Sequence, residues 1–151
     1  MHDQQPLDLL LNQRKEHWLM HCRFVLDELL LPLCNEGCVK TTSHSQRAVV
    51  LIENRIDKQW LFTVLNTWLM CPNDSEFVLI ADENSVAQAQ ELLNCYAPGL
   101  KANILDVAQI VPSTQLTDQA SFNSMLKQPG FWRNMPNEHL LVIQTDALLA
   151  K

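Results

Sequence analysis

The fold is decided by the stretch RAVVLIENR at residues 47–55. Its apolar centre, AVVLI, is rich in β-branched residues and is typical of a strand buried on both faces. Asp57 follows where it can cap a helix over residues 58–70, whose apolar side chains recur at intervals of three and four. A second apolar run begins at Glu76. A strand, a helix and a further strand joined by short loops predict a parallel βαβ unit with a right-handed crossover.

The same alternation of strand and helix continues to the end of the chain. One helix is expected to begin at Asn84 or Ser85, and another after a cap at Thr117 or Asp118. Residues 109–117 are expected to form a loop. The expected strands lie near residues 48–53, 77–81, 102–106 and 140–144. The sequence therefore predicts an α/β fold, with a Rossmann-like parallel sheet of about four strands flanked by helices.

A long amphipathic helix is expected before this domain, over residues 7–31. Its apolar stripe is formed by residues three or four positions apart, namely Trp18, Cys22, Val25 and Leu29, with Leu19, Leu26 and Leu30 beside them. Pro32 is expected to end the helix. Residues 1–46 then form a helical arm and linker, and residues 47–151 form the domain. Because a stripe of this length favours burial, we expect it to pack on the domain or to join two copies in a homo-oligomer.

Composition excludes some classes of protein. The chain has 151 residues, of which 47% are hydrophobic and 19% charged, which fits one folded domain rather than a disordered chain. The formal net charge of -6 argues against nonspecific binding of nucleic acid, which requires neutralisation of phosphates. The run from Leu26 to Leu33 contains acidic residues and a proline and is too short to span a membrane. Residues 1–8 do not resemble a secretory signal, so a cytoplasmic location is expected.

The five cysteines are an odd number, which favours free thiols in a reducing compartment. An alternative is a zinc site formed by His17, His21, Cys34 and Cys38. That alternative is weaker because the two cysteines do not form the close pair that structural zinc sites use.

Glycine is scarce, with only Gly37, Gly99 and Gly130 in the whole chain. The glycine-rich phosphate loops of dinucleotide-binding and P-loop proteins are therefore excluded. If the protein binds a phosphate group, a metal ion or side chains must hold it.

Polar residues follow the first and last expected strands, where ligands of open α/β sheets bind. Glu53 and Arg55 are two apart and project to the same side, so they either face a ligand or pair with each other. Asp146 follows the last strand and either binds a divalent metal or a ribose hydroxyl, or caps a turn.

The order of several motifs resembles that of the uncharacterised glycosyltransferase-like domains found in sugar-transferring proteins. The matching pieces are Glu53 and Arg55, Asn66, Asn84, Phe122-Asn123-x-x-Leu126, Phe131-Trp132 and Gln144-Thr145-Asp146. The resemblance covers residues 47–151. This family is similar in turn to the GT-A group of nucleotide-sugar transferases, in which an Asp-x-Asp motif holds Mn²⁺ or Mg²⁺ on the diphosphate.

The resemblance implies that Glu53, Arg55 and Asn84 contact the nucleotide. It also implies that Gln144 and Asp146 hold Mn²⁺ or Mg²⁺, which would stabilise the departing nucleoside diphosphate. The chain departs from the motif because Gln144 replaces the first aspartate. It also ends where the family continues with an acceptor-binding segment. Hexosyl transfer is therefore expected only if a missing C-terminal part completes the site.

A second hypothesis comes from a different class of protein. The chain can instead be a non-catalytic assembly or binding module that retains the α/β fold and associates through its N-terminal helix. The residues at the strand ends favour the first hypothesis, and the early end of the chain favours the second.

Overall fold

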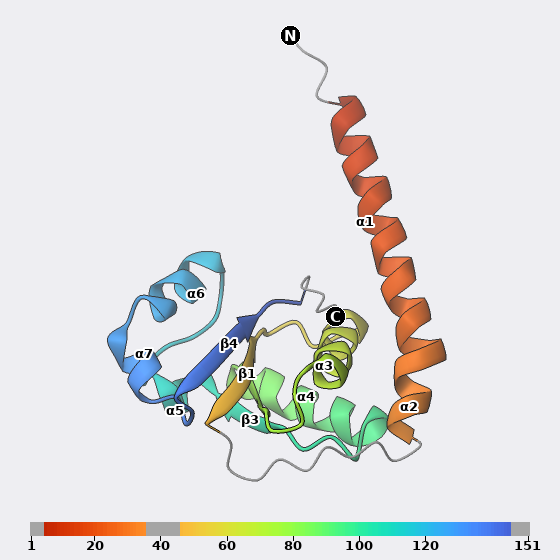
Figure 1. Ribbon diagram of the computed structural model, residues 1–151. Helices are drawn as coiled ribbons and strands as arrows, with labels where there is room; N and C mark the ends of the chain where they lie inside the picture. Colours follow the sequence, from red (N-terminus) through yellow and green to blue (C-terminus); the bar gives the residue numbers. More distant parts are fainter. Residues whose placement is uncertain (1–4, 36–45, 146–151) are drawn as a thin grey trace.

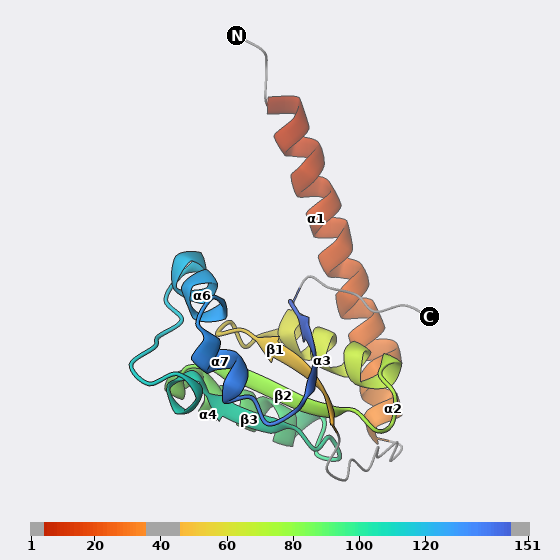
Figure 2. The ribbon, with the colours of Figure 1, turned by 60° about the vertical axis from the view of Figure 1, so that its left-hand side comes forward.

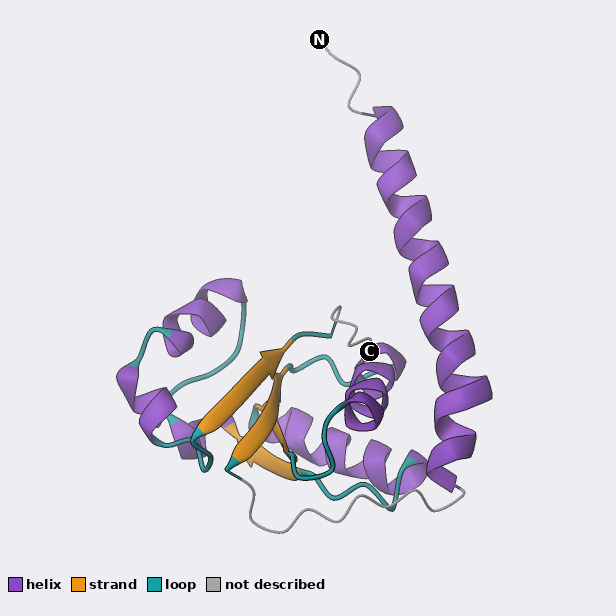
Figure 3. Ribbon diagram, in the orientation of Figure 1, coloured by secondary structure: helices purple, strands orange, loops and turns teal. Residues whose placement is uncertain are grey.

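The computed structural model describes the backbone of residues 5–35 and 46–145, and the side chains of residues 8–34 and 46–145. At its centre is a parallel sheet of four strands in the order β3-β2-β1-β4 (Figures 1 and 3). The strands are β1 (Arg47–Ile52), β2 (Glu76–Ala81), β3 (Asn103–Asp106) and β4 (His139–Ile143). The predicted α/β fold is confirmed, and each expected strand boundary lies within one residue of the observed one.

Helices cover both faces of the sheet. On one face lie the N-terminal helix, α3 (Lys58–Met70) and α4 (Glu83–Tyr96), and on the other lie α5 (Val107–Ile110), α6 (Gln119–Leu126) and α7 (Pro129–Arg133). β1 explains this layering, because successive side chains of a strand point to opposite faces. Val49 and Leu51 belong to the first core, and Val50 and Ile52 to the second. The continuous apolar run thus fills two cores at once.

The N-terminal helix does not end at Pro32. It runs as α1 (Gln5–Val25), a π turn η1 (Leu26–Leu30) and α2 (Leu31–Asn35). In η1 the N–H of Leu31 donates to the carbonyl oxygen of Leu26, five residues back. The prediction of a stop at Pro32 is wrong. A proline ring clashes with the carbonyl four residues back in a regular α turn, and the wider π turn relieves this clash.

The expected apolar face of the helix is buried in part. Cys22, Leu26 and Leu30 are buried, whereas Leu29, which was expected in the stripe, is 52% exposed. The helix packs in the core shared with α3 from Trp18 towards its carboxyl end. The amino-terminal half of α1 projects away from the sheet (Figures 1 and 2), and Leu9 and Leu11 on it are exposed. The expected burial of the apolar face is therefore confirmed for one half of the helix only.

Two helix starts differ from the sequence-based expectation. α4 begins one residue before Asn84, because the side chain of Asp82 caps it by accepting from the N–H of Ser85. α5 begins directly after β3 and extends into the expected loop at 109–117. Asp106 caps α5, whose single turn is too short for a helical period to be recognised. Among the described residues, no helix is long and apolar enough to cross a membrane.

Candidate functional site

A cleft of about 770 Å³ opens at the carboxyl ends of β1 and β4. These two strands are neighbours in the sheet, with Leu51 of β1 opposite Ile143 of β4, so the residues that follow them meet at one edge. The cleft is lined by residues 52–55 after β1, by Gln144 and Thr145 after β4, by α1 and by the segment that leads into α6. Sequence reasoning placed Glu53, Arg55 and Gln144 at this edge, and the structure brings all three to the cleft.

Glu53 and Arg55 pair with each other, as one of the two sequence-based alternatives proposed. The Nη2 of Arg55 lies 3.0 Å from Oε2 of Glu53, and its Nε donates to Oε1 at 3.2 Å. The backbone N–H groups of Asn54 and Arg55 also donate to Oε1. The side chain of Glu53 is only 17% exposed, whereas that of Arg55 is 79% exposed. The carboxylate therefore holds the loop after β1, and the guanidinium extends into solvent beside the cleft.

The pKa of Glu53 is shifted by these contacts. Burial on its own raises the pKa of this carboxyl group. The hydrogen bonds from the side chain and backbone of Arg55, its positive charge and a hydrogen bond from Thr145 outweigh burial, so the pKa of Glu53 lies below its ordinary value. Glu53 is thus a stable carboxylate at neutral pH and a poor proton acceptor.

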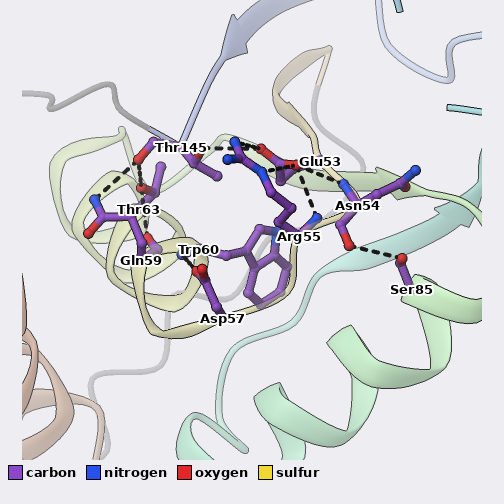
Figure 4. A network of polar contacts seen from close by, with 9 residues as sticks. All are labelled: Glu53, Asn54, Arg55, Asp57, Gln59, Trp60, Thr63, Ser85 and Thr145. Atoms are coloured by element: carbon purple, nitrogen blue, oxygen red, sulfur yellow. Dashed lines mark hydrogen bonds and ion pairs between the residues drawn. The ribbon is translucent and has the colours of Figure 1, made fainter. Parts of the chain in front are cut away.

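Thr145 joins the end of β4 to both β1 and α3 (Figure 4). Its hydroxyl donates to Oε2 of Glu53 at 3.2 Å. Its carbonyl oxygen accepts from the hydroxyl of Thr63 at 2.8 Å and from the side-chain amide of Gln59 at 3.3 Å. Sequence reasoning gave Thr145 no role of its own. Thr145 reaches Glu53 because β4 lies beside β1, and local sequence patterns do not predict the order of strands in a sheet.

Asn54 positions the other side of the cleft. Its Nδ2 donates to the carbonyl oxygen of Leu116 at 2.6 Å, and its Oδ1 accepts from the N–H of Asp82 at 2.9 Å. Its carbonyl oxygen accepts from the hydroxyl of Ser85, as Figure 4 shows. Asn54 therefore ties the segment before α6 and the start of α4 to the end of β1. The sequence-based prediction gave no role to this residue.

The helices that begin at this edge of the sheet have occupied N-termini. The side chains of Asp57, Asp82, Asp106 and Asp118 cap α3, α4, α5 and α6, respectively, by accepting from backbone N–H groups of the first turn. A free helix N-terminus is a ready phosphate site, because its N–H groups and dipole attract anions. Here a carboxylate already sits at each of these four positions. A phosphate group in the cleft must therefore be bound by other means, as the lack of glycine-rich loops also indicates.

Cationic and aromatic side chains are present in the cleft. Lys15 and Trp18 of α1 line it from one side, and Phe122 of α6 lines it from the other. Trp18 is half-buried and rests edge-on against Phe62, with ring centroids 6.5 Å apart. The arm thus contributes directly to the cleft, although the sequence predicted that the site belonged to residues 47–151 alone.

The remaining predicted site residues are placed as follows. Gln144 is exposed and lines the cleft. Asn84 is exposed in the first turn of α4 and is not among the residues that line the cleft. Asp146 lies outside the described residues, so its metal role stays a prediction.

Metal-ligating side chains do not cluster in the part of the chain that the structure describes. Within residues 8–34 and 46–145, no group of three His, Cys, Asp or Glu side chains is arranged to hold a metal ion. Cys38 of the alternative zinc site lies outside these ranges. None of the four described cysteines, Cys22, Cys34, Cys71 and Cys95, forms a disulfide bond.

Comparison of the chain with protein-family models, with curated proteins and with solved structures finds no match. The function must therefore be argued from the cleft itself.

Proposed function

We propose that the cleft binds a nucleotide-sugar and that the chain is the nucleotide-binding portion of a glycosyltransferase-like protein. The observation that carries the proposal is the position of the cleft at the adjacent carboxyl ends of β1 and β4. Ligands of open parallel sheets bind at such ends. A volume of about 770 Å³ falls within the range of small-molecule sites.

The side chains of the cleft match the parts of this ligand. Arg55 and Lys15 supply positive charge for the diphosphate, and a guanidinium can bind two phosphate oxygens at once. Trp18 and Phe122 supply flat apolar surfaces against which a base can rest. In this proposal Glu53 does not contact the ligand. It is a positioning residue that holds Arg55 on one side and Thr145 on the other.

A divalent cation completes the proposed site. Because the neighbouring helix N-termini are capped, Mn²⁺ or Mg²⁺ would offset the charge of the diphosphate. Gln144 lines the cleft and offers an amide oxygen, and Asp146 follows two residues later in the chain. Oxygen ligands of this kind suit both cations. Since Gln144 is neutral, the proposed affinity for the cation is lower than that of a pair of carboxylates.

The proposal covers binding and not transfer by this chain alone. A general base requires a carboxylate or imidazole that can accept a proton near neutral pH. Among the described residues of the cleft, Glu53 is bonded to Arg55 and Asp118 caps α6. Hexosyl transfer would need a base from further polypeptide that completes the site.

Calorimetry tests the proposal directly. UDP, GDP and their hexose conjugates are titrated into the protein in the presence of Mn²⁺. We expect binding in the millimolar to high-micromolar range for one base, equivalent to about -4 to -6 kcal/mol. Arg55→Ala should weaken it about tenfold, which is roughly 1.4 kcal/mol. Arg47→Ala is the matched control, since Arg47 lies at the opposite end of β1 and pairs with Asp74.

The metal role is tested separately in the same titrations. Asp146→Ala and chelation by EDTA should each abolish any dependence on Mn²⁺. Equal binding with EDTA would overturn the metal role alone. No binding of any nucleotide, or equal losses in Arg55→Ala and Arg47→Ala, would overturn the proposed site.

A second candidate function is an assembly module that associates through the N-terminal helix. The observation that favours it is the set of apolar side chains that α1 exposes. Leu9, Leu10, Leu11, Met20 and Phe24 are each more than half exposed. An exposed apolar surface of this kind is typical of an association site.

The test of this candidate is the mass of the protein in solution. If two copies join through the arm, the double substitution of Met20→Asp and Phe24→Asp should dissociate them, because it places charges in an apolar contact. Arg23→Asp, at an exposed polar position of the same helix, is the control. A dimer that survives the double substitution would exclude the arm as the interface.

A further inference from the structure

The sheet ends on one side in an apolar strand. Among the described residues β4 pairs with β1 only, so it is an edge strand. Its sequence, His-Leu-Leu-Val-Ile, contains no lysine and no proline, the residues with which proteins usually protect such an edge. Leu141 at its centre is 48% exposed. An unprotected apolar edge of this kind is a template for pairing with another strand.

The opposite edge of the sheet is different. β3 has four residues, begins with Asn103 and ends with Asp106, which caps α5. Polar ends and short length limit pairing at an edge. The contrast indicates that the open edge of β4 is a feature of this strand and not of the whole sheet.

The backbone groups of β4 that face outwards can be identified from its pairing with β1. The N–H of His139 donates to the carbonyl oxygen of Gln46, so His139 faces β1, and Leu141 and Ile143 do the same because the direction alternates along a strand. The N–H and C=O groups of Leu140 and Val142 therefore point away from the sheet. They are the groups that a further strand would bind.

We propose that two copies of the chain associate through β4, pairing edge to edge in antiparallel orientation about a twofold axis at Leu141. In this register Leu140 of one copy and Val142 of the other exchange both of their outward hydrogen bonds. Leu141 then lies opposite Leu141 of the second copy, in a non-hydrogen-bonded pair, where side chains are closest. The two four-stranded sheets become one continuous sheet, and the two exposed leucines contact each other.

The charges of the strand permit this register. Around Leu141, His139 lies opposite Ile143 of the second copy, and Glu138 lies opposite Gln144. Like charges directly opposite each other would destabilise the pair, and none occurs over residues 138–144. A strand of five residues pairs with itself completely only when the axis passes through its central residue, which here is Leu141. The occupant that fits this edge is therefore a second copy of the same strand.

The first test is the mass of the full chain in solution, measured by sedimentation over a range of protein concentration. We expect a monomer–dimer equilibrium that Leu141→Lys shifts to monomer, with its circular dichroism spectrum unchanged. Leu29→Lys is the matched control, because Leu29 is 52% exposed on the N-terminal helix. The pair of arm substitutions, Met20→Asp with Phe24→Asp, should leave the dimer intact. A monomer at every concentration, or a dimer insensitive to Leu141→Lys, would overturn the proposal.

The second test reads the register. Leu141→Cys should form a disulfide between two copies under mild oxidation, since a non-hydrogen-bonded antiparallel pair brings the two Cα atoms within disulfide range. His139→Cys is the control, because it faces Ile143 of the second copy in this register. Both are made in a background in which Cys34, Cys38 and Cys95 are replaced by serine. Crosslinking of His139→Cys but not of Leu141→Cys would contradict the proposed axis.

Discussion

β1 and β4 have nearly the same kind of sequence, AVVLI and LLVI, and pair with each other from Arg47 to Leu51 of β1, yet their surroundings differ. β1 is buried on both faces from Ala48 to Ile52, whereas in β4 only Ile143 is buried and Leu141 is half exposed. Position in the sheet accounts for the difference. An apolar run predicts a strand, and its neighbours decide whether the run becomes core or an interaction surface.

The largest effect is expected from a charge placed in the central strand. Val50 is fully buried between β2 and β4, so Val50→Asp puts an unpaired carboxylate in the core. The cost is several kcal/mol, comparable with the whole stability of a domain of this size, on the order of 5–15 kcal/mol. We expect no folded protein by circular dichroism. Leu141→Asp, which places the same carboxylate in the edge strand, should still fold. If it does not fold, the side chain of Leu141 contributes to the core.

A cavity in the central strand should cost less than a charge. Leu51 is 1% exposed, and Leu51→Ala should lower the free energy of unfolding by about 2–5 kcal/mol. For Leu141→Ala in the monomer we expect a loss of roughly 1 kcal/mol or less, since the side chain is already half in water. Urea titration of both variants measures the difference. Equal losses of unfolding free energy in the two variants would show that Leu141 is packed as tightly as Leu51.

The ends of the two strands are coupled through Glu53, which gives a pH-dependent effect. Because the folded state holds the pKa of Glu53 below its ordinary value of 4.5, its ionised form stabilises the fold above that pH. This contribution is lost as the pH falls through the lower folded-state pKa. Glu53→Gln should therefore be about 1–3 kcal/mol less stable than the natural chain at neutral pH, and the gap should narrow below pH 4.5. Thermal melts of both chains from neutral pH downwards test this, and a gap that widens on acidification would contradict it.

The smallest effect is expected at the link between the two strand ends. Thr145→Val removes the hydroxyl that donates to Glu53 and keeps the branched shape of the side chain. We expect a loss of about 0.5–1.5 kcal/mol, typical of one hydrogen bond. In the Glu53→Gln background the same substitution should cost less, because the acceptor is no longer charged. Additive losses in the double variant would show that the two side chains are not coupled.

The sequence predicted the fold well because the features that define it are local. Apolar runs of five or six residues marked β1 and β2, and aspartates at the right distance marked the starts of α3 and α6. Where the signal was not local, the prediction was wrong. A stop was expected at Pro32, but the π turn η1 lets the helix continue through it, and no spacing rule for a regular α-helix reveals that turn.

The candidate site was predicted only in part for the same reason. Glu53, Arg55 and Gln144 could be named because they directly follow apolar runs. Asn54 and Thr145 could not, since their roles come from partners more than 25 residues away, at Asp82, Leu116 and Glu53. The contribution of Lys15 and Trp18 depends on how the arm docks beside the sheet, which only the three-dimensional arrangement shows.

The π turn η1 sets the direction in which the whole arm faces. A π turn amounts to one extra residue in an α-helix, and each residue of an α-helix turns the chain by about 100°. Deleting one residue between Leu26 and Leu30 would restore a regular helix and rotate everything on its amino-terminal side by that angle. Trp18 and Cys22 would turn out of the core shared with α3, and Lys15 would leave the cleft. The single extra residue in η1 therefore determines whether side chains of the helix and of the strand ends line the same cleft.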